Sequence, residues 1–198
     1  MAETIQKRDT RAHLLAVGVV VLTLRGYNGA GIKEIVDAAG IPKGSFYNYF
    51  ASKEEFGVAV VEHYAANLLA RMDAITADAD YDPLTALSRY FAAIADSYEA
   101  AGTDDGCLLC NLGAEVPAQS RLIRQAMLRA FDAQQKHLTH ILQEAQRMGQ
   151  VRNDLSTEDL ADTLLNSWNG ALIRMKNEQD VRPLRQFLTV QVGEMLKG

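Results

Sequence analysis

Apolar residues recur along the chain at the three- and four-residue spacing of amphipathic helices, and nowhere do they alternate with polar residues as in a strand. The pattern therefore predicts an all-α protein. Glycines, prolines and capping residues delimit the expected helices, which cover about residues 8–25, 32–39, 43–49, 52–75, 83–101, 107–115, 118–148, 156–180 and 183–197.

Residues 31–50 predict a helix-turn-helix, because two short helices flank the tight turn Gly40-Ile41-Pro42. Phe46 and Phe50 lie four residues apart and are expected to anchor the second helix to the core. The opposite face would then carry groups suited to phosphates and base edges, such as an amide for adenine and a glycine that lets the backbone approach DNA. The candidate DNA-binding residues are Lys33, Lys43, Gly44, Ser45, Tyr47, Asn48, Tyr49 and Lys53.

Charge and composition change this picture only slightly. The net charge of −5 argues against a general coat of basic residues. Residues 1–53 nevertheless carry seven Lys or Arg against four Asp or Glu, a net of +3 that leaves −8 for the remainder. A basic end on an acidic body is what a DNA-reading head on an effector domain would show. Two cysteines, no secretory signal and no apolar run of membrane-spanning length favour a cytoplasmic protein without membrane contact.

The cysteines form the motif Cys107-Leu-Leu-Cys110 after the polar segment 102–106. We expect Cys107 in the first turn of a helix, where the partly positive N–H groups favour the reactive thiolate. The plainest alternative is that both thiols are small buried groups that pack a helix. A zinc site lacks a second cysteine pair, and a thiol–disulfide enzyme, the distant alternative, would want a strand–helix–strand context that the pattern does not offer.

Other residue clusters indicate neither an enzyme nor a metal site. His137, His140 and Glu144 share one helix face, but two imidazoles without a further convincing ligand favour a solvated stripe. No nucleophile–base–orienter set or Gly-rich phosphate loop occurs, so we expect no catalytic residues and no cofactor.

The stretch KGSFYNYF-x-SKEEF resembles the motif of the TetR family of regulators, and the preceding EIVDAAGI and LTLRGYNGAGIKEI resemble it as well. Asn48 departs from that pattern, in which histidine is commoner, and should alter contacts without abolishing binding. The resemblance implies an all-helical homodimer with two heads on a palindromic operator. Its interface would be formed by residues of about 156–197.

The GCL and NLxAE residues, with a later Trp168, Gly170, Ala171 and Lys176, resemble a branch of that family. This branch includes the electrophile-responsive repressor of the N-ethylmaleimide reductase operon and the acrylate-responsive repressors. The resemblance implies an effector-sensing role for Cys107, assisted by Lys176. Cys110 is not expected in the electrophile-responsive pattern, and a disulfide across an intact helix would be strained.

Together these observations predict a repressor with a helix-turn-helix head at residues 1–52 and an effector-binding and dimerisation body at residues 53–198. An electrophile or oxidant acting at Cys107 would release it from DNA, with Cys110, Trp168 and Lys176 completing the effector site. The alternative is a reversible small organic ligand in an apolar pocket.

Overall fold

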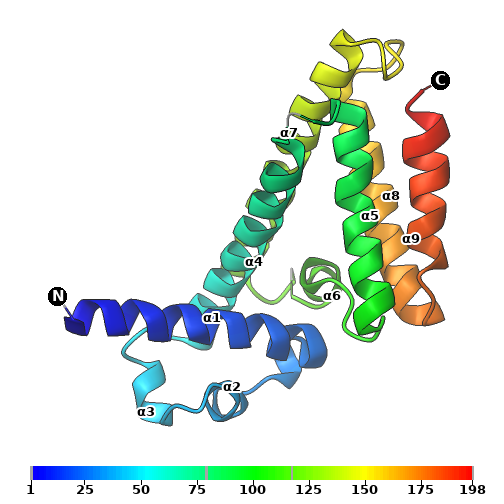
Figure 1. The fold of residues 1–198 in the computed structure, drawn as a ribbon. Helices are drawn as coiled ribbons and strands as arrows, with labels where there is room; N and C mark the ends of the chain where they lie inside the picture. The colour runs from blue at the N-terminus through cyan, green and yellow to red at the C-terminus, as the bar shows by residue number, and fades with distance from the viewer. Residues whose placement is uncertain (1, 79, 117, 198) are drawn as a thin grey trace. The chain divides into compact units, whose positions relative to one another are not determined.

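The computed structural model describes residues 2–78, 80–116 and 118–197, and within them it contains helices and no strand. Figure 1 labels α1 to α9, and the segment η1 continues α9 to the C-terminal side. The bounds are α1 (Ala2–Gly29), α2 (Ile32–Ala38), α3 (Lys43–Phe46), α4 (Lys53–Thr76), α5 (Pro83–Ala101), α6 (Leu108–Glu115), α7 (Arg121–Arg147), α8 (Thr157–Glu178), α9 (Arg182–Phe187) and the π-helical segment η1 (Leu188–Met195). The predicted all-α class is confirmed. None of the described helices combines the length and apolar character that a membrane span needs.

Capping residues set several helix bounds where the sequence predicts them. The Ser52 hydroxyl accepts from the N–H of Glu55 (3.0 Å), whose carboxylate in turn accepts from the N–H of Ala51 (2.7 Å). The Asp82 carboxylate caps α5 by accepting from the N–H of Thr85 (2.9 Å). Gly149 follows α7 at a φ of 72°, a conformation that glycine adopts at no steric cost.

Other bounds differ from the prediction. The first helix begins at Ala2, earlier than the predicted residue 8. Its regular part ends at the non-helical Gly26 (φ 72°, ψ 172°), as predicted, and a further short helical piece, which the sequence did not indicate, extends to Gly29. The third helix stops at Phe46, and a turn covers residues 47–49. Cys107 is the N-cap residue of α6, one position before its first turn. The last predicted helix consists of α9 followed by a π-helical segment.

The chain divides into two compact units. The first contains residues up to Ala66 together with Cys107–Ala130, and the second contains Asn67–Gly106 and the residues from Phe131 onward. The two units are defined by how compactly their residues pack and not by function. The predicted boundary at residues 52 and 53, between the helix-turn-helix head and the effector-binding body, therefore stays a prediction.

The first unit is organised around the start of α4, where Phe46, Phe50 and Phe56 are buried and in ring contact with centroids 5.0–5.5 Å apart. Two glycines allow close helix packing. A Cβ at Gly18 would lie 2.4 Å from the Phe56 ring, and one at Gly57 would lie 2.8 Å from Ile123. The sequence therefore fixes how closely α1 and α7 approach α4 in this unit.

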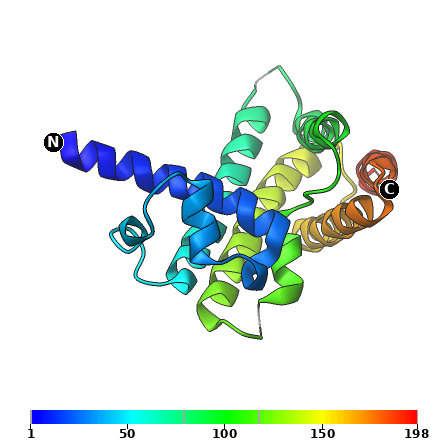
Figure 2. The same ribbon diagram turned by 90° about the horizontal axis from the view of Figure 1, so that it is seen from below.

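In the second unit, α5, α8 and the helix formed by α9 and η1 lie side by side, and Figure 2 shows α5 and the α9–η1 helix nearly end-on, with α8 seen obliquely beside them. Their shared core is aromatic. Phe91, Trp168 and Phe187 are each no more than 5% exposed, and their ring centroids lie 4.8–5.0 Å apart.

Candidate nucleic-acid interface and thiol site

Buried phenylalanines anchor the helix-turn-helix in the core of the first unit, and its polar groups are exposed to solvent. Phe46 is 0% exposed and Phe50 is 1% exposed, which confirms their predicted role as anchors. Lys43, Gly44, Tyr47 and Asn48 are exposed, and Tyr47 has 54% of its surface accessible. A Cβ at Gly44 would meet no atom within 4 Å, so the surface there is open to a partner. Ser45 and Tyr49 are half-buried.

The two flanking lysines make local contacts. Lys33 donates to Asp37 one helical turn later (3.0 Å), an exposed ion pair that contributes little stability. Lys53 is the first residue of α4, and its ammonium lies 4.5 Å from the centroid of the Tyr27 ring. Burial lowers the pKa of Lys53, and the Glu115 carboxylate partly opposes that shift. Lys33 is therefore largely exposed, whereas Lys53 is half-buried against Tyr27.

Cys107 lies at the start of α6 against α4. The residue is 6% exposed, and its sulfur accepts from the Tyr64 hydroxyl at 3.4 Å. The strongest influence on this thiol is a hydrogen bond from the Cys110 side chain, which, with help from Tyr64 and the N–H groups of Cys110 and Leu109, outweighs burial and lowers the pKa of Cys107 to about 6.

Cys110 has the opposite character. The bond to Cys107 raises the pKa of Cys110, and burial and the neighbouring thiolate raise it further. Of the two thiols, Cys107 therefore loses its proton the more readily, and Cys110 keeps its proton. A lowered pKa is the character expected of a nucleophilic thiol.

The helix that begins at Cys107 is tied to the end of α1. The Asn111 side-chain amide donates to the Thr23 carbonyl (3.0 Å). The Glu115 carboxylate accepts from the N–H groups of Tyr27 (2.9 Å) and Asn28 (2.6 Å), just after the kink at Gly26. A displacement of α6 would therefore act directly on this kink at Gly26, the hinge of α1.

The N-terminal side of that hinge holds the helix-turn-helix. The His13 ring donates through Nε2 to the Ala39 carbonyl at the end of α2 (3.1 Å). Near the hinge, Arg25 pairs with Glu34 of α2 (3.3 Å). Polar contacts thus run from α6 through α1 to the first helix of the motif.

The sequence pattern missed several of these residues. Tyr64 looks like one more member of the apolar ridge of α4, and Asn111 and Glu115 look like ordinary polar positions on a short helix. The four-residue spacing of Asn111 and Glu115 puts them on one face, the only signal in the sequence that they act together.

Trp168 and Lys176 belong to the second compact unit, whereas Cys107 and Cys110 belong to the first. Trp168 is buried in the aromatic core, and Lys176 donates to the Asp105 carbonyl (3.3 Å). The assistance of Cys107 by Lys176 stays a prediction.

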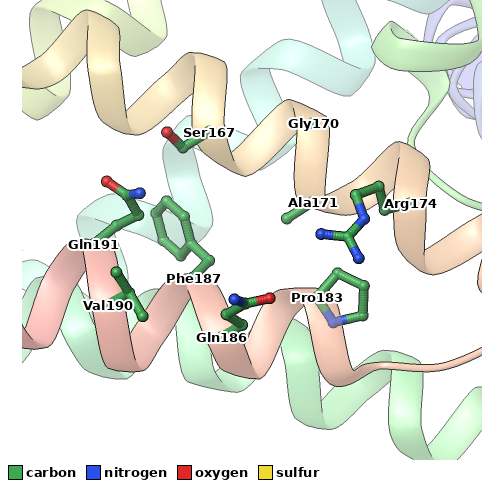
Figure 3. A pocket seen from close by; sticks show the side chains of 9 residues that line it. All are labelled: Ser167, Gly170, Ala171, Arg174, Pro183, Gln186, Phe187, Val190 and Gln191. Carbon is green, nitrogen blue, oxygen red and sulfur yellow. The ribbon is translucent and has the colours of Figure 1, made fainter.

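Two surface depressions lie among the described residues of the second unit. One, with a volume of about 460 Å³, lies between α8 and the α9–η1 helix (Figure 3), and its lining is Ser167, Gly170, Ala171, Arg174, Pro183, Gln186, Phe187, Val190 and Gln191. The other, of about 290 Å³, contains the His137 ring 3.2 Å from the Asp73 carboxylate. Among the described residues, no group of three or more His, Cys, Asp or Glu is arranged to hold a metal ion.

Two family models match this chain. Residues 14–60 match the bacterial regulatory proteins of the tetR family, and residues 83–190 match the tetracyclin repressor-like C-terminal domain. The chain is 40% identical over 190 residues to the transcriptional repressor DhaR of Mycobacterium sp. (strain GP1), covering 96% of this chain and 94% of DhaR. It is 33% identical over 186 residues to the repressor NemR of Escherichia coli (strain K12), covering 92% of each.

Solved structures agree with these sequence matches. A regulatory protein TetR from Rhodobacter sphaeroides superposes with a TM-score of 0.86 at 32% identity, over 92% of this chain and 96% of that one. The reduced form of E. coli NemR gives a TM-score of 0.84 at 33% identity, over 91% and 94%.

Proposed function

The chain belongs to the TetR family and is a transcriptional repressor, and we propose that it leaves its operator when an electrophile or oxidant modifies Cys107. One observation carries this proposal. Cys107 has a lowered pKa at the start of a helix that is hydrogen-bonded to the hinge of the DNA-binding head. The likeness to NemR, for which a reduced form has been crystallised, supports a thiol as the sensor.

Modification would act by displacing α6. A group added to the Cys107 sulfur needs space where the Tyr64 hydroxyl now lies at 3.4 Å. The start of α6 would have to move, and Asn111 and Glu115 would pass the movement to α1. Release follows only if the modified state binds DNA more weakly than the free state, and a coupling of about 1–3 kcal/mol corresponds to about 5- to 150-fold in affinity.

The recognition surface in this proposal is the exposed face of residues 43–49 with Lys33 and Lys53 beside it. Lys43, Tyr47 and Asn48 would contact DNA, and the open surface at Gly44 would let the backbone come close. Two such faces about 34 Å apart would fit successive turns of the major groove of a palindromic operator.

The second copy would pack on α8 and the α9–η1 helix. Ile173 and Val190 are large apolar residues with 50% and 46% of their surface exposed. The depression in Figure 3 contains Gly170, where a Cβ would meet nothing within 4 Å, so a partner helix has room to approach. These features support a homodimer through residues of about 156–197.

The test is fluorescence anisotropy of the full-length protein on labelled DNA from upstream of its own gene, before and after N-ethylmaleimide. We expect the reagent to weaken binding by the wild-type protein and not by Cys107→Ser. Release of both proteins would place the sensor elsewhere. If the reagent leaves operator binding unchanged in both the wild-type protein and Cys107→Ser, the result would favour the reversible-ligand alternative.

A further inference from the structure

The two cysteines of the thiol site are placed for a bond with each other. Cys107 is the N-cap residue of α6, with an extended backbone (φ −100°, ψ 130°), and Cys110 is the third residue of the helix. An N-cap side chain reaches over the second and third helical residues, which is how serine or aspartate caps a helix. A separation of three residues at a helix start puts the two Cα atoms about 5 Å apart, within the range that disulfides require.

This placement removes the expected obstacle to a disulfide. The strain predicted from the sequence assumes that both residues lie inside the helix, where Cβ atoms three residues apart are about 5–6 Å from each other. A disulfide requires about 3.5–4.5 Å between its Cβ atoms. Because Cys107 precedes the first turn, its side chain can turn toward Cys110 without breaking a helical hydrogen bond of its own N–H group. The Cys110 side chain already donates to the Cys107 sulfur.

The surroundings restrict the oxidant. Cys107 is only 6% exposed, and Cys110 is partly buried. A small uncharged molecule such as hydrogen peroxide can enter such a site with little rearrangement, whereas a bulky reagent must displace its walls. The Tyr64 hydroxyl beside the sulfur offers a proton donor to an incoming peroxide oxygen.

We propose that Cys107 and Cys110 form a reversible internal disulfide when the protein meets a peroxide, with Cys107 as the attacking thiol and Cys110 as the resolving thiol. This inference rests on the proposed function, because it specifies how the same site is oxidised and restored. It also gives Cys110 a chemical role beyond packing.

The reaction balances in two steps. The Cys107 thiolate attacks one peroxide oxygen, the O–O bond breaks, and the departing hydroxide takes a proton to become water, leaving a sulfenic acid on Cys107. The Cys110 sulfur then attacks the Cys107 sulfur, the S–O bond breaks, and the Cys110 proton leaves with the hydroxyl group as a second water. Two thiols are oxidised to one disulfide, and one peroxide is reduced to two waters.

The disulfide would also change the contacts that hold α6. It removes the thiolate that accepts from Tyr64 and fixes the first turn of the helix. Asn111 follows Cys110 directly and bonds to the Thr23 carbonyl, so the distortion begins one residue from the link to α1. A thiol reductant reverses the bond, which makes the signal recoverable.

The experiment treats full-length wild-type protein, Cys110→Ser, Cys110→Ala and Cys107→Ser with hydrogen peroxide, then removes the peroxide with catalase. Free thiols, intact mass and operator binding are measured, each protein being compared with its own reduced sample. In the wild type we expect both thiols to disappear and the monomer mass to fall by about 2 Da. Operator affinity should fall by about 5- to 150-fold and return with dithiothreitol.

The Cys110 variants should instead proceed to sulfinic acid on Cys107, and dithiothreitol should not restore their binding. Agreement of the serine and alanine variants, with unchanged melting temperatures, separates loss of the resolving thiol from a folding defect. Peptide mapping of the wild type needs no variant at all and shows directly whether residues 107 and 110 are joined.

The inference is overturned if the wild type keeps both thiols, or if it acquires oxygen on Cys107 or links two subunits in place of an internal disulfide. In those cases, N-ethylmaleimide that releases the wild type and not Cys107→Ser would leave the proposed function intact. An internal disulfide that changes operator binding by less than about twofold, alongside failure of N-ethylmaleimide, would instead refute the proposed function.

Discussion

Glu115 offers the sharpest test of how the thiol site communicates with the DNA-binding head. Its carboxylate accepts from the N–H of Tyr27 at 2.9 Å and from the N–H of Asn28 at 2.6 Å, so it acts as the N-cap for the helical turn that follows Gly26. We expect Glu115→Ala to destabilise the protein, because these two N–H groups would lose their acceptor.

The size of the effect follows from the two hydrogen bonds. A hydrogen bond to a charged group contributes about 1.5–3 kcal/mol, and loss of an N-cap costs about 0.5–2 kcal/mol. The bond to Tyr27 is part-buried and the bond to Asn28 is exposed, so we take the upper end of the N-cap range, about 2 kcal/mol, for the two bonds together. For a chain of this size that corresponds to a melting temperature lower by about 4–8 °C.

The assay is thermal unfolding at fixed protein concentration, since dimerisation makes the melting temperature depend on concentration. Glu115→Gln keeps one acceptor but presents an amide N–H to the other donor, so its loss should be about half as large, about 1 kcal/mol. Asp104→Ala, which removes an exposed carboxylate from a loop, serves as the matched control and should melt as the wild type does.

The same variant tests the coupling. In Glu115→Ala, N-ethylmaleimide should still alkylate Cys107. The resulting change in operator affinity should be smaller than in the wild type, because the hydrogen bonds from Tyr27 and Asn28 to α6 are lost while the bond from Asn111 is kept. A melting temperature within about 1 °C of the wild type, together with an undiminished response to alkylation, would refute the assigned route from α6 to α1.

Three further predictions concern packing, titration and assembly. Gly18→Ala should cost about 1–3 kcal/mol in chemical denaturation, because its Cβ would lie 2.4 Å from the Phe56 ring, whereas Gly29→Ala, whose Cβ would approach nothing nearer than 3.8 Å, should cost little; equal stabilities would contradict the packing argument. Because the pKa of Cys107 is lowered, its alkylation rate should rise with pH through about 6 and then level off; a midpoint near 9.0, the ordinary value, would show an unactivated thiol. Val190→Asp should shift the protein from dimer to monomer in light scattering after gel filtration, since it would bury a charge in the proposed interface; an unchanged dimer would place the interface elsewhere.

Much of the local structure could be predicted from the sequence because its causes lie within a few residues. The capping pair Ser52 and Glu55, the Asp82-Pro83 start of α5 and the glycine after α7 each act inside one helical turn. The same holds for Phe46 and Phe50, whose spacing alone puts them on one face, and the structure buries both.

The thiol site shows where this reasoning stops. The sequence indicates that Cys107 starts a helix, but only the tertiary structure brings up the Tyr64 hydroxyl, which lies 43 residues away along the chain. It also places Cys107 at the N-cap, one residue before the predicted first turn. At that position the strain of a disulfide between two residues inside an intact helix does not apply.

Gly26 in the DNA-binding head also shows which features depend on local sequence and which depend on tertiary contacts. The sequence by itself determined that regular helix is interrupted there, since glycine readily adopts the positive φ of 72°. Whether the helix then ended or resumed depended on an acceptor for the next N–H groups, and Glu115, 88 residues after Tyr27, supplies it. Propensity, spacing and capping act locally and can be read along the chain, whereas the partners of buried and half-buried polar groups are chosen only when distant segments pack together.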